Sequence, residues 1–293
     1  MSIRTILWPT DFSDDSRHAL EHAVAIARWY SARIIALHAL SPSNVDVPVL
    51  AGADHVSAAD TCRGSLGADL KSAATGLETF REVVESSAVP AIVTYAAQND
   101  VDLIVIGTHG AGGFEHLILG SVTEKVLRKA PCPVLTVPPR ARATSSLPFK
   151  QIVCPTDFSR SSFAAMKMAF EFAQEGAAHL TLAHILEDPD ENELFVPRAY
   201  DIHHHREARV KQVREHLEAL VPQSVRDWTT TSYVVGTGKA YQEILRIADE
   251  ERADLIVMGL QGRSPFDLML FGSTTNQVVR RATCPVLTTR ALE

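Results

Sequence analysis

The chain has 293 residues, of which 46% are hydrophobic and 22% are charged. These proportions are typical of a globular protein and exclude a disordered or fibrous chain. The formal net charge is −7, since residues 1–146 carry 12 basic and 15 acidic groups and residues 147–293 carry 16 and 20. Because binding to a phosphate backbone needs clustered lysines and arginines, we expect no nucleic-acid partner.

No segment of the chain reads as a targeting or membrane-spanning sequence. Arg4 leads directly into a strand pattern, and no apolar stretch approaches the ~20 residues of a membrane span. None of the four cysteines lies in a CxxC pair, which predicts free thiols in a reducing compartment. We therefore expect a cytoplasmic protein with no membrane partner.

The first half alternates strand and helix patterns. A short apolar run at its start predicts a strand that Pro9 ends. Ser13, followed by two acidic residues, predicts the cap of a helix that runs to about Tyr30. The segment that follows the second strand has little periodicity at first. In chain order, the other expected elements are strands at 33–40, 79–83, 102–106 and 133–137, and helices at 91–99 and from Ser121 onward.

The second half repeats the first. Asp157, within Ile152-Val153-Cys154-Pro155-Thr156-Asp157-Phe158-Ser159, lies 146 positions after Asp11 in the matching stretch, whereas later matches are offset by 152. The elements expected here are strands at 179–186, 231–235, 254–258 and 285–289, and helices after Ser159, at 241–251 and from Ser273 onward.

A repeat of half the chain length indicates duplication of a whole globular unit rather than a solenoid. The alternation of strands and helices predicts an α/β fold made of two tandem, doubly wound domains with mainly parallel sheets. A Pro- and Ser-rich stretch after the fifth strand marks the junction. We expect one domain at 1–140, a linker at 141–149 and a second domain at 150–293.

Two motifs fall where such a sheet binds ligands, beyond the carboxyl ends of its strands. A Pro-Thr-Asp triplet directly follows the first strand of each half, and a glycine loop of pattern G-x2-G-x9-G-S follows the fourth. The triplets are Pro9, Thr10 and Asp11, and Pro155, Thr156 and Asp157. The loops contain Gly107, Gly110, Gly120 and Ser121, and Gly259, Gly262, Gly272 and Ser273.

The glycine loop favours an anion such as phosphate. Glycines let the backbone approach a ligand closely, and the loop ends at a helix start, where unpaired N–H groups attract negative charge. The pattern is neither a P-loop nor a GxGxxG dinucleotide fingerprint. A purely structural interpretation also stands, because Ser121-Val122-Thr123-Glu124 reads as a capping box.

With both motifs present in both halves, nearly the whole chain resembles a tandem member of the universal stress protein family. The resemblance implies adenine nucleotide alpha hydrolase-like domains packed as a pseudo-dimer, with the closing strands 134–137 and 286–289 paired. It also implies ATP as ligand, accompanied by Mg²⁺. Adenine would be bound by Pro9, Thr10, Asp11, the backbone of Ala39, Pro155, Thr156, Asp157 and Ile185. Ribose and phosphates would be bound by Gly107, Gly110, Gly120, Ser121, Val122, Gly238, Gly259, Gly262, Arg263, Gly272, Ser273 and Thr274.

The halves depart from each other at three positions near the expected pockets. Gly238 fills a place where ATP-binding relatives often have glycine, whereas Ser86 stands there in the first half, so a side chain could crowd the first pocket. Arg263 could reach a phosphate or remain solvated. His109 could act as an acid or base near phosphates, or could serve only as a hydrogen-bonding loop residue.

The sequence therefore predicts an ATP-binding stress protein that acts as a nucleotide-responsive regulator, with at most slow hydrolysis and no catalytic residue. Two alternatives stay open: an enzyme that processes an adenine nucleotide, and a partner-binding stress protein without nucleotide. A homodimer is also left open. Consecutive histidines do not share a helix face, so we expect no metal site at His203-His204-His205.

Overall fold

The computed structural model describes residues 2–41, 57–110, 119–141, 149–187, 202–262 and 272–291, without the side chains of 202–205. The predictions for Arg263 and for the side chains of His203–His205 lie outside this description. The chain forms two compact units. Unit 1 comprises Met1–Leu147 with Ala282–Thr289, and unit 2 comprises Pro148–Arg281 with Arg290–Glu293.

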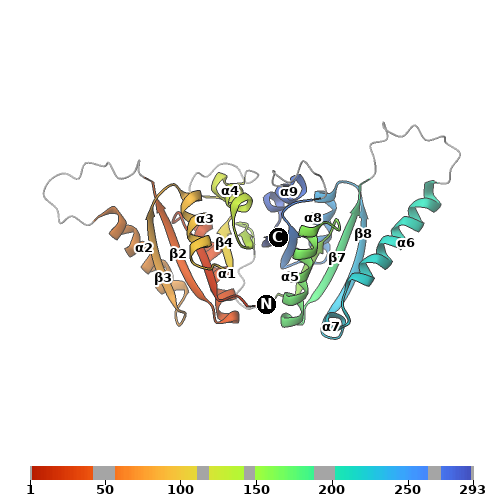
Figure 1. Cartoon of the computed structure of the whole chain (residues 1–293), viewed down its shortest axis with the longest axis horizontal. Coiled ribbons are helices and arrows are strands. Elements are labelled where there is room, and N and C mark those ends of the chain that lie inside the picture. Colours follow the sequence, from red (N-terminus) through yellow and green to blue (C-terminus); the bar gives the residue numbers. More distant parts are fainter. Residues whose placement is uncertain are drawn as a thin grey trace. The chain divides into compact units, whose positions relative to one another are not determined.

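Unit 1 is built on a parallel sheet with the strand order β3-β2-β1-β4-β5 (Figure 1). Every residue of the two central strands β1 and β4 is buried, as expected of strands covered on both faces. The strands are β1 (Thr5–Pro9), β2 (Arg33–Leu40), β3 (Thr79–Glu85), β4 (Leu103–Gly107) and β5 (Val134–Val137).

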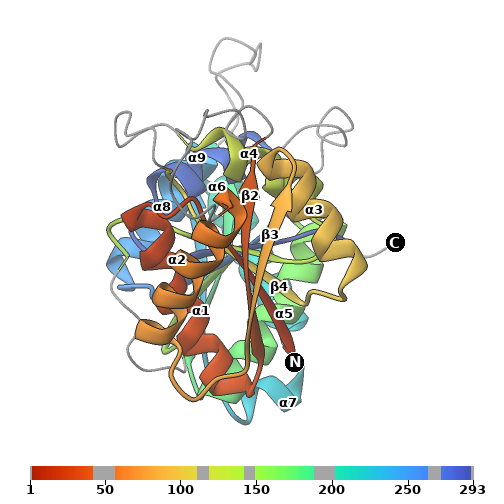
Figure 2. The ribbon, with the colours of Figure 1, turned by 90° about the vertical axis from the view of Figure 1, so that its left-hand side faces the viewer.

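In the described part of unit 1, two helices cover each face of this sheet. The first pair, α1 and α2, packs together on one face, and α3 and α4 pack on the other; the view along the sheet edge shows α1 and α2 opposite α3 (Figure 2). The helices are α1 (Asp14–Tyr30), α2 (Ala58–Ala73), α3 (Ala88–Gln98) and α4 (Ser121–Lys129).

Unit 2 repeats this arrangement with the parallel order β9-β6-β7-β8. Helices α5 and α6 lie against one face of the sheet, and α8 and α9 pack together on the other. Its strands are β6 (Gln151–Pro155), β7 (His179–Leu186), β8 (Thr230–Thr237) and β9 (Leu255–Gly259). Its helices are α5 (Arg160–Gly176), α6 (Ile202–Leu220), α7 (Gln223–Arg226), α8 (Ala240–Glu250) and α9 (Ser273–Arg281).

The last strand, β10 (Val286–Thr289), belongs to unit 1 although it comes from the second repeat. It pairs antiparallel with β5, with Leu287 opposite Leu135. The hydroxyls of Thr136 and Thr288 donate to the carbonyls of Val286 and Val134, at 3.1 and 3.3 Å. The pairing of the two closing strands is thereby confirmed.

Local sequence signals placed the first helix of each unit correctly. The hydroxyl of Ser13 accepts from the amide of Ser16, and that of Ser159 accepts from Ser162, both at 3.2 Å. These bonds satisfy amides that the helix itself cannot. Within the described part of the chain, no helix combines the length and apolar character that crossing a bilayer requires.

Candidate functional site

The triplet that follows β1 forms a turn tied to the neighbouring strand. The amide of Thr10 donates to the carbonyl of Leu37 at 2.9 Å, and its hydroxyl lies 2.8 Å from that of Ser16. The same hydroxyl accepts from the amide of Phe12 at 3.0 Å. Thr10 and Pro9 are buried, so of the three predicted residues only Asp11 presents its side chain at the surface.

Unit 2 forms the same turn with the residues at the matching positions of its own sheet and helix. The amide of Thr156 donates to Ala183 at 2.8 Å, and its hydroxyl lies 3.0 Å from that of Ser162 and accepts from Phe158 at 3.0 Å. The same set of bonds thus holds the turn in both units.

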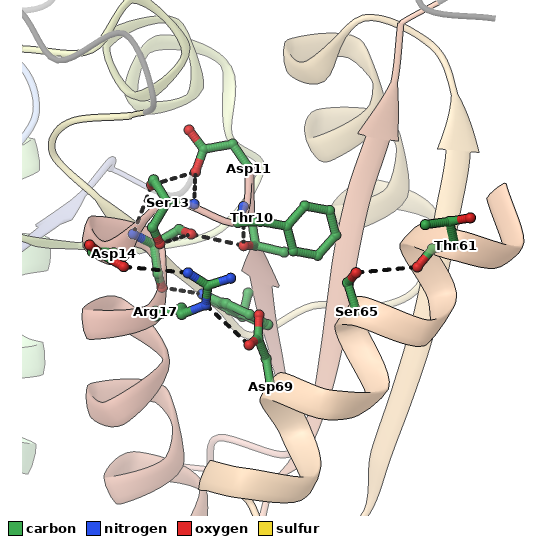
Figure 3. A network of polar contacts seen from close by, with 11 residues as sticks. Thr10, Asp11, Ser13, Asp14, Arg17, Thr61, Ser65 and Asp69 are labelled. Atoms are coloured by element: carbon green, nitrogen blue, oxygen red, sulfur yellow. Dashed lines mark hydrogen bonds and ion pairs between the residues drawn. The ribbon is translucent and has the colours of Figure 1, made fainter. Parts of the chain in front are cut away.

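The aspartate of each turn is oriented by the serine two residues later. Asp11 Oδ1 accepts from the amide and the hydroxyl of Ser13, at 3.1 and 2.5 Å, and Asp157 Oδ1 accepts from the amide of Ser159 at 3.0 Å. This side-chain-to-backbone pattern is an Asx-turn, which fixes the carboxylate relative to the backbone. Figure 3 shows Asp11 above the start of α1, away from Arg17.

Arg17 forms its ion pairs with carboxylates other than that of Asp11. Its guanidinium contacts Asp14 at 3.4 Å and Asp69 of α2 at 3.1 Å (Figure 3). The hydrogen bond from Arg17 to Asp69 raises the pKa of that arginine. This cation beside the turn thus links α1 to α2 instead of facing Asp11.

Two histidines that sequence reasoning missed support these turns. His38 Nδ1 donates to the carbonyl of Thr10 at 2.9 Å, and His184 Nδ1 donates to that of Thr156 at 2.7 Å. Their rings stack on Phe12 and Phe158, with centroids 4.5 and 4.6 Å apart. One available signal was that the two histidines are separated by 146 residues, as the two Pro-Thr-Asp triplets are.

The phenylalanines adopt an unfavourable backbone conformation. Phe12 and Phe158 both have φ of 63°, in the left-handed region that costs a side-chain-bearing residue about 1–2 kcal/mol. An aromatic contact and a hydrogen bond each contribute about 0.5–1.5 kcal/mol. The histidine therefore offsets the strain of the turn through its ring stack and its bond to the threonine carbonyl.

The glycine loop of unit 1 lies against the aspartate turn. A side chain at Gly110 would place its Cβ 2.7 Å from Asp11 Oδ2, and one at Gly107 would place it 3.0 Å from the carbonyl oxygen of Asp15. A side chain at Gly110 would displace the carboxylate of Asp11, and one at Gly107 would press on the backbone of Asp15. The structure thus brings the two predicted motifs together at one edge of the sheet.

Helix α4 begins without a side-chain cap. Gly120 is its N-cap residue and Ser121 is its first helical residue, so the predicted capping box at Ser121 is wrong. The amide of Gly120 is instead held by the carbonyl of Thr108 at 2.8 Å. Within the described residues, no acceptor meets the amides of Ser121 and Val122. Such a helix start is a ready site for an anion.

The loop of unit 2 is anchored differently. The hydroxyls of Ser159 and Ser161 donate to the carbonyl of Gln261, the former at 3.4 Å. A Cβ at Gly259 would lie 2.7 Å from the carbonyl carbon of Ser161. The amide of Gly272 donates to Leu260 at 3.2 Å, which brings the two ends of the loop together before Ser273 and Thr274.

The two units also differ where β2 meets β3 and β7 meets β8. Ala39 lies opposite Val84, whereas Ile185 lies opposite Gly236, and a Cβ at Gly236 would be 2.9 Å from Ile185 Cδ1. In unit 1 the larger residue of the pair is therefore on the edge strand β3, whereas in unit 2 it is on the inner strand β7. Gly238 has φ of 126°, a backbone conformation that residues with a side chain rarely adopt. A Cβ at this position would meet only a side-chain carbon, so the backbone conformation, and not close packing, accounts for the glycine.

His109 lies in the glycine loop of unit 1, directly before Gly110. Its Nδ1 lies 3.0 Å from the hydroxyl of Thr108, a residue that is 1% exposed. Its Nε2 is buried and has no hydrogen-bond partner among the described residues. A hydroxyl and an imidazole are therefore adjacent, although the hydroxyl is shielded from solvent.

Comparison with known sequences matches residues 2–138 and 148–290 to the Universal stress protein family. A universal stress protein of Methanocaldococcus jannaschii is 36% identical over 138 residues, which are 46% of this chain and 81% of that protein. One from Mycobacterium tuberculosis is 26% identical over 240 residues, or 80% of this chain and 75% of that protein.

Among solved structures, a universal stress protein from Archaeoglobus fulgidus aligns with a TM-score of 0.68 and 21% identity. The alignment covers 99% of this chain and 97% of that chain. The predicted fold, two tandem α/β domains with mostly parallel sheets, is thereby confirmed.

Proposed function

Because this chain belongs to the universal stress protein family, with a family domain in each half, we propose that it binds ATP, accompanied by Mg²⁺, in two matching pockets. It would act in the cytoplasm as a nucleotide-responsive regulator of the stress response. Members of the family bind adenine nucleotides. The observation that carries the proposal is the close approach of Gly110 to the carboxylate of Asp11, which places a glycine loop and an oriented acceptor at one sheet edge.

The aspartate suits the base of the nucleotide. A carboxylate accepts a hydrogen bond from the exocyclic amino group of adenine, and a backbone amide pairs with a ring nitrogen. Asp11 and Asp157 would supply the first contact, and the backbone at Ala39 and Ile185 the second. The Asx-turn supports this role because it holds the carboxylate in one orientation.

The glycine loop suits the phosphates. Its glycines let the loop backbone pack closely on the rest of the unit, Gly107 against the carbonyl of Asp15 and Gly120 against that of Thr108. The amides at the start of α4 lack a side-chain cap. A helix N-terminus with unpaired N–H groups stabilises a phosphate through hydrogen bonds and its dipole. Mg²⁺ would neutralise phosphate charge when bound with the nucleotide. In unit 2, Gly259, Gly262, Gly272, Ser273 and Thr274 would have these roles.

Turnover would be slow, and binding rather than chemistry would be the function. The alternative of an adenine-nucleotide-processing enzyme is favoured by the hydroxyl–imidazole pair of Thr108 and His109. Two observations weigh against it. Thr108 is 1% exposed, and unit 2 has Leu260 and Gln261 in the matching places.

Calorimetry of the full chain with Mg-ATP tests the proposal, using Gly120→Asp, Gly272→Asp and the double variant. Aspartate is a favourable N-cap residue, so each new carboxylate would cap α4 or α9 itself and repel phosphate. Two molecules of ATP are expected per wild-type chain, one per single variant and none for the double variant. Gly64→Asp is the matched control, because it adds the same charge to α2 where nothing lies within 4 Å of its Cβ.

The outcomes separate the three functions. Equal binding by the wild type and the double variant would place ATP elsewhere and refute the proposed pockets. A folded wild type that binds no ATP and releases no nucleotide on denaturation would support the partner-binding alternative. Steady hydrolysis above roughly 1 per second would support the enzyme.

A further inference from the structure

We propose that His38 and His184 are positioning residues for base recognition. Each holds the turn that carries Asp11 or Asp157, and through the turn it sets the preference for adenine over a base without an amino group. The inference rests on the proposed nucleotide function and assigns part of the specificity to side chains on β2 and β7.

The first step is the anchoring of the residue before each aspartate. In unit 2, the amide of Thr156 donates to Ala183 at 2.8 Å, and the carbonyl of Thr156 accepts from His184 Nδ1 at 2.7 Å. Both backbone groups of this threonine are therefore bound to β7. The first bond holds the peptide plane before Thr156, and the bond from His184 holds the peptide plane between Thr156 and Asp157.

The second step is the residue after each aspartate. Phe158 has φ of 63°, and this conformation lets the amide of Ser159 turn back to Asp157 Oδ1 at 3.0 Å. The ring of Phe158 lies 4.6 Å from that of His184. One imidazole thus fixes the backbone on both sides of the aspartate, by a hydrogen bond before it and a ring contact after it.

The third step is the recurrence of this geometry in different surroundings. The residues next to the histidines, Ala39 and Ile185, differ in size, and in unit 2 the ring of His216 lies 4.8 Å from that of Phe158. The hydrogen bond and the stack nevertheless recur in both units. What the two arrangements share is the orientation of a carboxylate, which is the feature that base recognition requires.

The test measures nucleobase preference in the full chain that carries Gly120→Asp, so that unit 2 alone binds. Affinities for ATP, inosine triphosphate and tripolyphosphate are determined by calorimetry for His184→Phe, which keeps a ring but removes the donor. The preference for ATP over inosine triphosphate is expected to fall about tenfold, the scale of a hydrogen bond to a charged group. Tripolyphosphate affinity should stay unchanged.

Two further variants sharpen the result. His184→Asn retains a donor near the place of Nδ1 but loses the ring contact, and should recover part of the preference for ATP. His179→Phe is the matched control, because His179 lies at the opposite end of the same strand; it should change none of the three affinities. If His184→Phe does not fold, Phe158→Gly removes the ring contact, keeps the positive φ accessible and should also lower the preference.

An equal loss of affinity for all three ligands in His184→Phe would show a general structural role and overturn the inference. So would equal behaviour of the phenylalanine and asparagine variants, or full ATP preference in Phe158→Gly. Failure of the Gly120→Asp background chain itself to bind ATP would instead refute the proposed function, and the inference with it.

Discussion

At the scale of single residues, close packing distinguishes glycines that the fold requires from those that it tolerates. Gly259 ends β9 against the start of α5, where an added Cβ would lie 2.7 Å from the carbonyl carbon of Ser161 and 2.8 Å from the amide of Ser162. Both atoms are backbone, so the helix would have to move. Gly64, within α2, has nothing within 4 Å of the place of its Cβ.

Gly259→Ala should therefore lower the free energy of unfolding by about 1–3 kcal/mol, the usual cost of overpacking. Gly64→Ala should raise it by about 0.5–1 kcal/mol, because alanine restricts the unfolded chain and favours a helix. Urea denaturation of the two variants measures both effects. Equal stability of the variants would contradict the close approach of β9 and α5.

A second prediction at this scale concerns His22 in α1. Burial, with a smaller contribution from neighbouring His18, lowers the pKa of His22 to about 4. The unfolded chain takes up this proton near pH 6.5, whereas the folded chain resists until about pH 4. The stability linked to His22 is therefore fully present above pH 6.5 and is lost as the pH falls towards 4.

The loss should reach about 3 kcal/mol, since each pKa unit corresponds to about 1.4 kcal/mol. Denaturation midpoints measured from pH 7.5 to 4.5 give the wild-type slope, and His22→Leu should flatten it by removing the titrating group. An identical slope in the variant would mean that other groups dominate acid sensitivity.

At the scale of elements, the bounds of a strand or helix were predicted best where a single sequence pattern decided them. Strands β2 and β7 were predicted at their observed bounds, because burial on both faces makes them continuously apolar. Strand β3 was predicted at 79–83 but extends to Glu85. Two charged residues, Arg81 and Glu82, interrupt its apolar pattern. The structure explains the arginine: a Cβ at Gly67 of α2 would lie 2.7 Å from Arg81 Nη1, so the guanidinium lies in space that this glycine leaves.

The motifs of the candidate site could be predicted from the sequence, but the residues that hold those motifs in place could not. The glycines and the aspartates follow from strand-end positions, which the repeat makes visible. The N-cap of α4 was assigned to Ser121 because serine is a common cap, yet the loop geometry places Gly120 there. His38 lies in an apolar strand, and only the fold shows that its Nδ1 reaches the carbonyl of Thr10.

The pairing of β10 with β5 yields a prediction for a chain that ends at Arg281. Removal of β10 leaves the N–H and C=O groups of the β5 edge without the partners that Val286–Thr288 provide. Hydrogen–deuterium exchange at Val134–Val137 should therefore become much faster than in the full chain. Unchanged protection there would show that β10 contributes little to unit 1.

At the scale of the whole molecule, nucleotide binding should raise the free energy of unfolding. A ligand that binds only the folded state stabilises it by about 2.7 kcal/mol at a hundred times its dissociation constant. Saturating Mg-ATP should therefore raise the melting temperature of the wild type. The chain with both Gly120→Asp and Gly272→Asp should show no shift, and differential scanning calorimetry provides the measurement. A shift of equal size in that variant would refute binding in these pockets.

The position of β10 bears on the inheritance of this gene. The last strand of the second copy, β10, pairs with β5 in the sheet of the first copy. A deletion of the second copy therefore also removes the strand that pairs with β5. A first copy that stands alone therefore needs another strand to pair with β5. A fragment of the first copy prepared for laboratory work should accordingly carry residues 282–289 as an added tail.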